Sequence, residues 1–332
     1  MSLSSAKVID VHAHVVLAET FGAAGDLGPE MGGQDGDAPW FRVGDYRLDG
    51  VRYQGSAFMD TGLRLARMQA AGIEFQVLSP NPLSFLHFVD TGTAIQFCET
   101  HNNALQAVVA ANSDHFAGMA ALPMQDIGAA IAELERAVTT LGLRGGYIGT
   151  DMPLPLDDLA MDRLYETCVR LNVPLFIHPS PAGIDGPAGD PNLRDYDLDV
   201  VIGFAAQEAL AVARLIYGGV LDRHPDLDIC LSHGGGSTGY LIGRMAMASR
   251  KRPWASAELN ADGAFEQRLS RLWFDNHLNN DNSLAMLTNI VGDDRLVFGT
   301  NFSGWDAPDD LSAHLPPLKL ADNARRLLRA AQ

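Results

Sequence analysis

Four histidines stand where they could hold a metal ion. Asp10, His12 and His14 alternate in the segment DVHAH, so on a β-strand all three side chains would share one face. Two neutral imidazoles side by side are typical ligands of Zn²⁺ or a similar divalent cation. His178 ends the apolar run VPLFIH, and His233 ends LDICLSH, after which three glycines follow. Each histidine taken alone is equally well explained as a polar residue that ends a strand.

Short apolar runs alternate with amphipathic segments along the whole chain. The runs that predict strands span residues 7–14, 74–79, 116–122, 145–149, 173–178, 227–233, 272–276 and 295–300. The amphipathic segments between them predict helices, for example over 58–72, 126–142, 156–172 and 283–294. Strand followed by helix, repeated eight times, favours parallel pairing, because only crossover connections join parallel strands. The sequence therefore predicts an α/β fold, a (β/α)8 TIM barrel that forms one domain over residues 1–332.

The four histidines gather at the carboxyl ends of predicted strands 1, 5 and 6, the face on which barrels build their active sites. The other six of the ten histidines are scattered in helices, turns and loop starts: His87, His101, His115, His224, His277 and His314. This arrangement predicts a metal-type site. Two long segments, 17–58 and 179–198, follow strands 1 and 5, so we expect both to line the same face. The first holds a candidate hairpin in WFRVGDYRLDGVRY.

The composition narrows the class of protein. Of 332 residues, 47% are hydrophobic and 20% are charged, which is ordinary for a soluble globular chain. The formal net charge of −17 disfavours nucleic acid and anionic membranes as partners. Cys98, Cys168 and Cys230 lack metal-type spacing, and we expect inert core thiols in a reducing compartment. No segment resembles a signal peptide, and no stretch reaches membrane-spanning length, so the sequence predicts a cytoplasmic protein.

The motifs resemble those of the amidohydrolase superfamily, in particular the branch of aminocarboxymuconate-semialdehyde decarboxylase and related aromatic-acid decarboxylases. The most specific segments are IDVHAH, VPLFIHPS, LIYGGVLDRHPDLDICLSHGGG, YLIGR and DRLVFGTN. The resemblance implies that His12, His14 and His178 bind one divalent metal, Zn²⁺ with Mn²⁺ as the alternative. It implies that His233 is a catalytic histidine and that a carboxylate of strand 8 completes the metal site. It also suggests a homodimer.

The segment GTNFSG departs from this pattern, because Asn301 stands where decarboxylases of the branch carry Asp. A neutral amide oxygen can coordinate a metal, but it is a poorer ligand for Zn²⁺ than a carboxylate, so we expect a weakened metal site that includes Asn301. Asn301 cannot act as a general base, which disfavours ordinary amide or ester hydrolysis. Two acids could compensate: Asp275 at the end of strand 7, also explained as a strand cap, and Asp306 in the loop after strand 8.

A carboxylate substrate needs a cationic partner, and arginine forks match carboxylates bidentately. Arg52, at the end of the segment 17–58, and Arg244, in YLIGRM, match arginines of the resembling decarboxylases, and each is also explained as a surface charge. Arg47 and Arg194 are weaker candidates.

Four aromatic residues near strand ends could line an apolar wall against a ring or a diene: Phe85, Phe88, Phe204 and Trp305. Aromatic residues at such positions are also commonly part of the core.

The preferred hypothesis is a metal-dependent decarboxylase, a carbon–carbon lyase, acting on a small unsaturated or aromatic carboxylic acid. His233 and Asp275 are its predicted catalytic residues, and Arg52, Arg244 and Trp305 are predicted to bind the substrate. Two alternatives stay open. A hydratase or C–C hydrolase of unsaturated keto acids would use the same metal and His233, and a non-catalytic barrel would only bind a small carboxylate.

Overall fold

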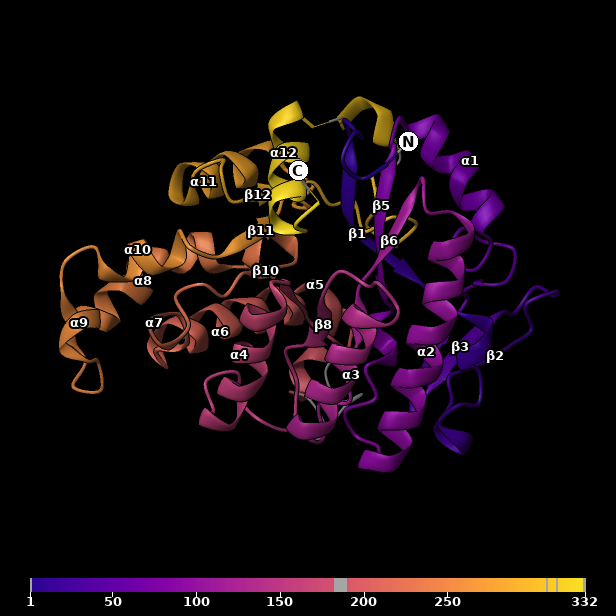
Figure 1. Cartoon of the computed structure of the whole chain (residues 1–332), viewed down its shortest axis with the longest axis horizontal. Helices are drawn as coiled ribbons and strands as arrows, with labels where there is room; N and C mark the ends of the chain where they lie inside the picture. Colours follow the sequence, from indigo (N-terminus) through magenta and orange to yellow (C-terminus); the bar gives the residue numbers. More distant parts are fainter. Residues whose placement is uncertain (1, 182–189, 309, 315, 331–332) are drawn as a thin grey trace.

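Parallel strands form the centre of the structure and helices lie outside them (Figure 1). The computed structural model describes residues 2–181, 190–308, 310–314 and 316–330. One sheet has the strand order β1-β5-β6 and a second has the order β12-β11-β10-β9-β8-β7. The strands are β1 (Ile9–Val15), β5 (Phe75–Pro80), β6 (Phe116–Gly118), β7 (Ala120–Ala121), β8 (Gly146–Gly149), β9 (Leu175–His178), β10 (Ile229–Leu231), β11 (Trp273–Asp275) and β12 (Leu296–Val297). The α/β class and the parallel pairing predicted from the sequence are confirmed, and every predicted strand segment overlaps an observed strand.

Backbone hydrogen bonds outside the assigned ladders link the two sheets at both junctions. Val11 N–H donates to Phe298 O at 2.9 Å, which joins β1 to the segment that follows β12. Met119 N–H donates to Leu78 O at 2.9 Å, which joins β5 of the first sheet to the residue between β6 and β7. The last strand segment therefore lies beside the first.

Successive side chains along each strand belong alternately to two buried hydrophobic clusters. One hydrophobic cluster contains a residue from each of the strand segments: Val11, Val77, Met119, Tyr147, Phe176, Cys230, Trp273 and Val297. The intervening residues, such as Leu78, Ile148 and Ile229, belong to a second cluster together with side chains from the helices. Because successive strand residues point to opposite faces, one set fills the space between strands and the other packs under the helices.

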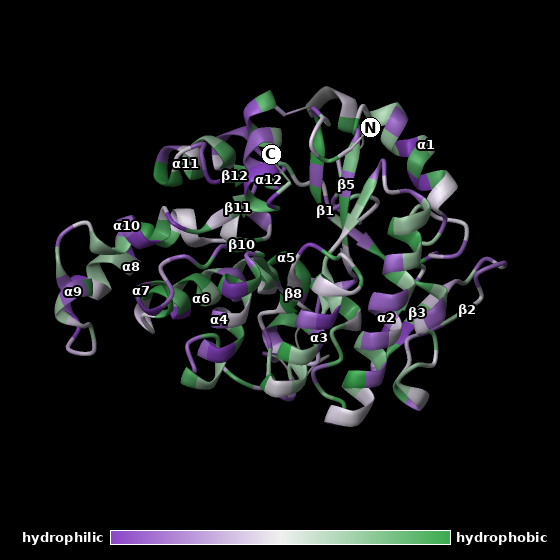
Figure 2. Ribbon diagram, in the orientation of Figure 1, coloured by the Kyte–Doolittle hydropathy of each residue, from purple (hydrophilic) through white to green (hydrophobic). Residues whose placement is uncertain are grey.

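The main helices are amphipathic and cover the strands. They are α1 (Thr61–Ala71), α2 (Thr91–Ala111), α3 (Ile127–Thr139), α4 (Asp162–Leu171), α6 (Gly203–Tyr217), α8 (Thr238–Lys251), α11 (Asp281–Val291) and α12 (Leu318–Leu327). Shorter helices are α5 (Leu198–Val201), α7 (Val220–Arg223), α9 (Ala257–Asn260) and α10 (Ala264–Leu269). Apolar and polar patches alternate along α2 and α3 in Figure 2, as a helix with one buried face requires.

The segment between β1 and α1 carries a small antiparallel sheet of β2 (Glu30–Gly32), β3 (Trp40–Val43) and β4 (Tyr46–Asp49). The predicted hairpin forms from β3 and β4, whose residues Val43 and Tyr46 pair at the turn. Of the predicted loop 179–198, residues 182–189 lie outside the described residues.

One expectation about membrane-spanning length was wrong. The segment Leu198–Tyr217, which combines α5 and α6, is 20 residues long and apolar enough to cross a membrane by length and composition. Its residues Val212, Leu215 and Ile216 are buried in the core, and its Glu208 is fully buried and bonded to His233. Core helices pass the same test, and these contacts place one face of α6 in the core.

The turn after β10 packs directly on α6. Gly236 has a φ of +61°, and a Cβ there would lie 2.3 Å from the carbonyl oxygen of Ala205. Ser237 N–H donates to the same oxygen at 3.1 Å. Only glycine allows this approach, which fixes the short segment that begins at His233.

Gly236→Ala is expected to lower the free energy of unfolding by about 1–3 kcal/mol, because the new side chain would meet backbone atoms in a left-handed conformation. The matched control is Gly243→Ala within α8, where a Cβ meets nothing within 4 Å. That change should stabilise the chain by up to about 1 kcal/mol, because alanine is the better helix former. Urea unfolding followed by circular dichroism measures both, and equal midpoints for the two variants would contradict this packing.

Candidate active site

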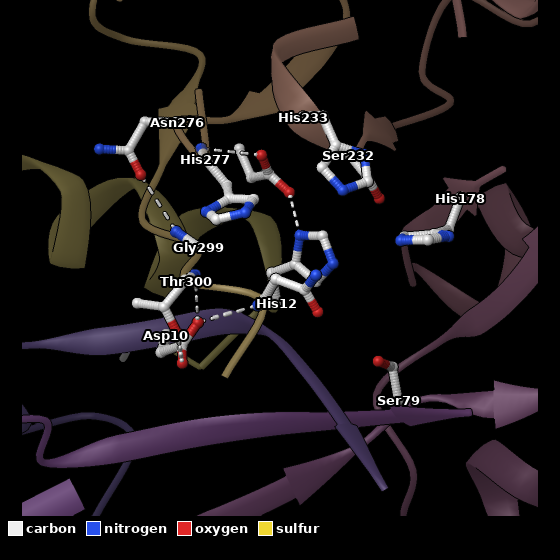
Figure 3. Close-up of polar contacts among 12 residues, drawn as sticks. Asp10, His12, Ser79, His178, Ser232, His233, Asn276, His277, Gly299 and Thr300 are labelled. Carbon is white, nitrogen blue, oxygen red and sulfur yellow. Dashed lines mark hydrogen bonds and ion pairs between the residues drawn. The ribbon is translucent and has the colours of Figure 1, made fainter. Parts of the chain in front are cut away.

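A buried carboxylate anchors the strand that carries the first two histidines. Asp10 accepts hydrogen bonds from the backbone N–H groups of His12 at 3.0 Å and Thr300 at 3.1 Å. It also accepts from Thr300 Oγ1 at 2.8 Å and Gln76 Nε2 at 2.9 Å. Figure 3 shows Asp10 and Thr300 beside His12. The carboxylate thus ties together β1, β5 and the chain after β12.

His12, His14 and His178 form a compact triad. One ligand nitrogen of each lies within 4.8 Å of the others, and all three side chains are buried. His12 Nε2 lies 3.2 Å from His14 Nε2, and the His178 ring centroid is 5.1 Å and 4.8 Å from those of His12 and His14. The structure therefore brings together the three histidines predicted as metal ligands.

The opposite nitrogen of each imidazole is already engaged. His12 Nδ1 bonds to Asp275 Oδ2 at 2.8 Å, His14 Nδ1 to Pro80 O at 2.9 Å, and His178 Nδ1 to Pro179 O at 2.6 Å. Such partners fix the tautomer of a metal-ligating histidine with the proton on Nδ1, so that the lone pair of Nε2 is available to coordinate a metal.

The triad has the chemistry of a divalent metal site. The buried Nε2 of His178 has no hydrogen-bond partner among the described residues, although leaving a buried polar atom unpaired is costly. Burial lowers the pKa of all three imidazoles, which keeps them in the neutral form that coordinates metals. The residues present therefore fit a divalent cation.

Asp275, predicted as catalytic, has both oxygens engaged. Oδ2 bonds to His12, and Oδ1 accepts from the backbone N–H of His277 at 3.1 Å. It lies at the end of β11 and is buried, so its contacts are those of a residue that orients His12.

His233 lies next to the triad and is backed by an acid that the sequence did not reveal. Its ring centroid is 4.9 Å from that of His12 and 5.0 Å from that of His178. Its Nδ1 bonds to Oε1 of Glu208, a fully buried residue of α6, at 2.8 Å. Burial lowers the pKa of His233, but the charge and hydrogen bond of Glu208 outweigh it and raise the pKa to about 9. The sequence feature that could have indicated Glu208 is that it is a single acidic residue within an otherwise apolar helical segment.

A fifth histidine joins the group. His277, which the sequence placed among the scattered histidines, has its ring 5.6 Å from that of His12 and 5.7 Å from that of His233 (Figure 3). Its Nε2 bonds to Asp306 Oδ2 at 3.1 Å, and Asp306 Oδ1 accepts from Asn301 Nδ2 at 2.5 Å. Burial opposes ionisation of Asp306, but these partners and the nearby imidazoles hold its pKa below the usual value. Asp306 is therefore ionised beside Asn301, as one of the two compensating acids considered above.

The predicted arginines are exposed. Arg52 donates to Gly36 O, and Arg244 lies on the outer part of α8. Neither forms a hydrogen bond with the five histidines in the described part of the chain. Arg47 pairs with Asp49, and Arg194 is exposed.

Of the predicted aromatic wall, Phe204 and Trp305 lie near the histidines or the adjoining cavity. The Phe204 ring is half-buried, 5.7 Å from that of His178 and 6.1 Å from that of His233. Trp305 is 72% exposed and lines a cavity of about 970 Å³ that also reaches His277 and Thr300. Phe85 is buried against Tyr147, and Phe88 is half-buried near Gly44.

Asp10→Asn is expected to destabilise the protein by about 2–4 kcal/mol, because one amide oxygen cannot accept from all the donors that meet the carboxylate, and each buried donor left unpaired costs about 1–3 kcal/mol. Asp60→Asn is the matched control: Asp60 caps α1 by accepting from Leu63 N–H, and asparagine caps equally well. Urea midpoints measure both. A control that loses as much stability as Asp10→Asn would contradict the anchoring role.

The chain is similar in sequence to proteins named as decarboxylases. The chain is 31% identical over 244 residues to 2-amino-3-carboxymuconate-6-semialdehyde decarboxylase of Dictyostelium discoideum, a match covering 73% of this chain and 66% of that protein, just under two thirds of its length. It is 29% identical over 320 residues to gamma-resorcylate decarboxylase of Rhizobium radiobacter, covering 88% of this chain and 93% of that protein.

Solved structures share the fold. The dihydroxybenzoic acid decarboxylase of Polaromonas sp. JS666, with bound manganese and the inhibitor 2-nitroresorcinol, superposes with a TM-score of 0.73 at 22% identity, covering 97% of this chain and 96% of that chain. The family model described as amidohydrolase matches residues 9–330. The resemblance predicted from the motifs is confirmed: the chain belongs to the amidohydrolase family.

Proposed function

We propose that the protein is a metal-dependent decarboxylase of a small aromatic or unsaturated carboxylic acid. The observation that carries the proposal is His233, hydrogen-bonded to the buried Glu208 and lying beside a histidine triad suited to a metal. Decarboxylation needs an acid that gives a proton to the carbon losing CO₂, and it needs no strand 8 general base. The relatives named as decarboxylases support the same reaction class.

Each part of the site has a proposed task. A divalent metal held by His12, His14 and His178, with Asn301 beside them, would act as a Lewis acid on substrate oxygens. Zn²⁺ is the proposed metal, because three imidazoles suit it, and the manganese of the structural neighbour supports Mn²⁺ as the alternative. His233 delivers the proton to the carbon that loses CO₂. Glu208 orients its ring through the hydrogen bond to Nδ1 and stabilises its protonated form.

We infer that the strands close into a single-domain (β/α)8 barrel, with residues 17–58 as an insertion on its active face. The hydrogen bond from Val11 to Phe298 and the interior cluster with one residue per strand support this closure. The triad and His233 then lie at the carboxyl ends of their strands, where barrel enzymes bind substrate.

The substrate and assembly proposals rest on surface features. Phe204 and Trp305 would contact an apolar ring, and Arg52 and Arg244 would meet its carboxylate. Arg244 lies on α8 with the exposed apolar residues Tyr240 and Met247, a composition that favours a homodimer contact there. The net charge of −17 favours a small acid rather than nucleic acid or membrane as partner, in a cytoplasmic protein.

The direct test is the mass of the product after incubation with hydroxybenzoic and unsaturated dicarboxylic acids. Loss of CO₂ supports the proposal. Gain of water would instead identify the hydratase alternative, and binding by calorimetry without any product would identify a carboxylate-binding barrel.

The His178→Ala variant should lose the metal and turnover together, because it removes the triad nitrogen that has no hydrogen-bond partner within the described part of the chain. Plasma mass spectrometry after equilibration with Zn²⁺ or Mn²⁺ should find about one metal per native chain. His115→Ala, at a histidine outside the cluster, should keep the native content. A metal-replete and active His178→Ala would refute the assigned ligand set.

Glu208→Gln should lower turnover about 10–100-fold while leaving the metal content near the native value, because it removes the carboxylate that holds His233. Steady-state kinetics with an acid that the product-mass test identifies as a substrate measure the effect as a fall in kcat. The matched control is Glu166→Gln on the exposed side of α4, which should keep native kinetics. Native turnover in Glu208→Gln would contradict the role of the pair.

A further inference from the structure

The backbone on either side of the strand 8 asparagine is fixed to β1, the strand that carries His12 and His14. Thr300 bonds to Asp10 through both its N–H and its hydroxyl. Phe302 N–H donates to the carbonyl oxygen of His12 at 3.1 Å. Asn301, between them, is 9% exposed and has a φ of +47°, a conformation that asparagine tolerates better than most residues. Residue 301 therefore lies beside His12 in a defined backbone conformation.

The amide of Asn301 has one orientation because of Asp306. The Asn301 Nδ2 donates to Asp306 Oδ1 at 2.5 Å, which is the direction expected between an amide N–H and a carboxylate oxygen. Asp306 is itself held: His277 Nε2 bonds to its other oxygen at 3.1 Å, and Asn279 Nδ2 donates to its carbonyl at 2.7 Å. The amide oxygen of Asn301 is left outside this contact.

Gly304 confines the same amide from another side. A Cβ on Gly304 would lie 2.6 Å from Cγ, Nδ2 and Oδ1 of Asn301, and Gly304 N–H donates to the carbonyl of Asn301 at 2.6 Å. The turn thus has room for the amide only because residue 304 lacks a side chain.

We propose that Asp306 is a positioning residue of the metal site: by holding the Asn301 nitrogen, it leaves the amide oxygen as the one atom that residue 301 offers to a cation on His12, His14 and His178. The carboxylate missing from position 301 stands five residues later and acts through the asparagine. This inference rests on the metal site of the proposed function, but it does not depend on which reaction that site performs.

One rival arrangement uses the same residues. Ligand atoms of His233, His277 and Asp306 also lie within 4.8 Å of one another, so Asp306 could instead bind a cation directly. A direct ligand would act whether or not Asn301 is present, whereas a positioning residue acts only through it.

The test is a double-mutant cycle on the full chain, with Zn²⁺ and Mn²⁺ affinities measured by competition with a chromophoric chelator. Asp306→Asn should weaken binding at least about 10-fold, because an amide at 306 no longer selects the orientation of Asn301. In the Asn301→Ala background the same change should cause no further loss. The exchange Asn301→Asp with Asp306→Asn should restore binding to the native level or above, because a carboxylate needs no orientation to accept.

Two further variants test whether the loss of metal affinity comes from the lost orientation of Asn301 or only from a lost negative charge or from misfolding. Asp281→Asn removes the same charge from an exposed acid that lines the same cavity as His277, and it should bind metal as the native chain does. Gly304→Ala keeps the charge but displaces the amide, and it should weaken binding as Asp306→Asn does, which provides a second test if Asp306→Asn fails to fold.

The proposal is overturned if Asp306→Asn binds like the native chain, if it loses as much affinity in the Asn301→Ala background, if the exchange restores nothing, or if the native chain binds no metal. Metal binding that depends on Asp306 without turnover of any acid would refute the proposed function alone.

Discussion

The buried carboxylate of Asp10 is the constraint on which the site depends. It has no exposed surface, and its oxygens accept four hydrogen bonds from β1, β5 and the chain after β12. A charge can be buried only when donors replace its water, so these segments must meet at one register. Arg64 reinforces the same point, since it is buried, bonds to Gln76 at 2.9 Å and donates to the carbonyl of His14. The backbone that carries His12 and His14 is thereby fixed before any metal binds.

Three histidines of the cluster are each paired with an acid from a different element. His12 pairs with Asp275 of β11, His233 with Glu208 of α6, and His277 with Asp306. Acids beside imidazoles orient the rings and stabilise positive charge near them. The two other histidines, His14 and His178, bond instead to carbonyl oxygens, and burial lowers the pKa of both and also that of His12. The cluster is thus divided into neutral nitrogens suited to a cation and a charged histidine suited to proton transfer.

Much of the fold follows from local pattern. The apolar runs located each strand of the two parallel sheets, because a strand buried on both faces reads as a continuous apolar segment. The hairpin of β3 and β4 lies within WFRVGDYRLDGVRY, the segment predicted to hold one. The expectation that no stretch reaches membrane-spanning length failed at α5 and α6. A helix packed in a core and a helix in a membrane can have the same apolar composition, so the sequence pattern does not distinguish them.

The sequence by itself determined which segments form the parallel strands, and hence placed His12, His14, His178 and His233 in or just after them, because strand patterns are local properties. It also showed that Asn301 stands where the resembling decarboxylases carry aspartate. Only the tertiary structure decided which acid meets which histidine. His12 and Asp275 are 263 positions apart, and His233 and Glu208 are 25 apart on different elements. His277 joined the cluster for the same reason: a partner is chosen by which side chains the packed strands and helices bring within hydrogen-bond distance, and no local pattern carries that information.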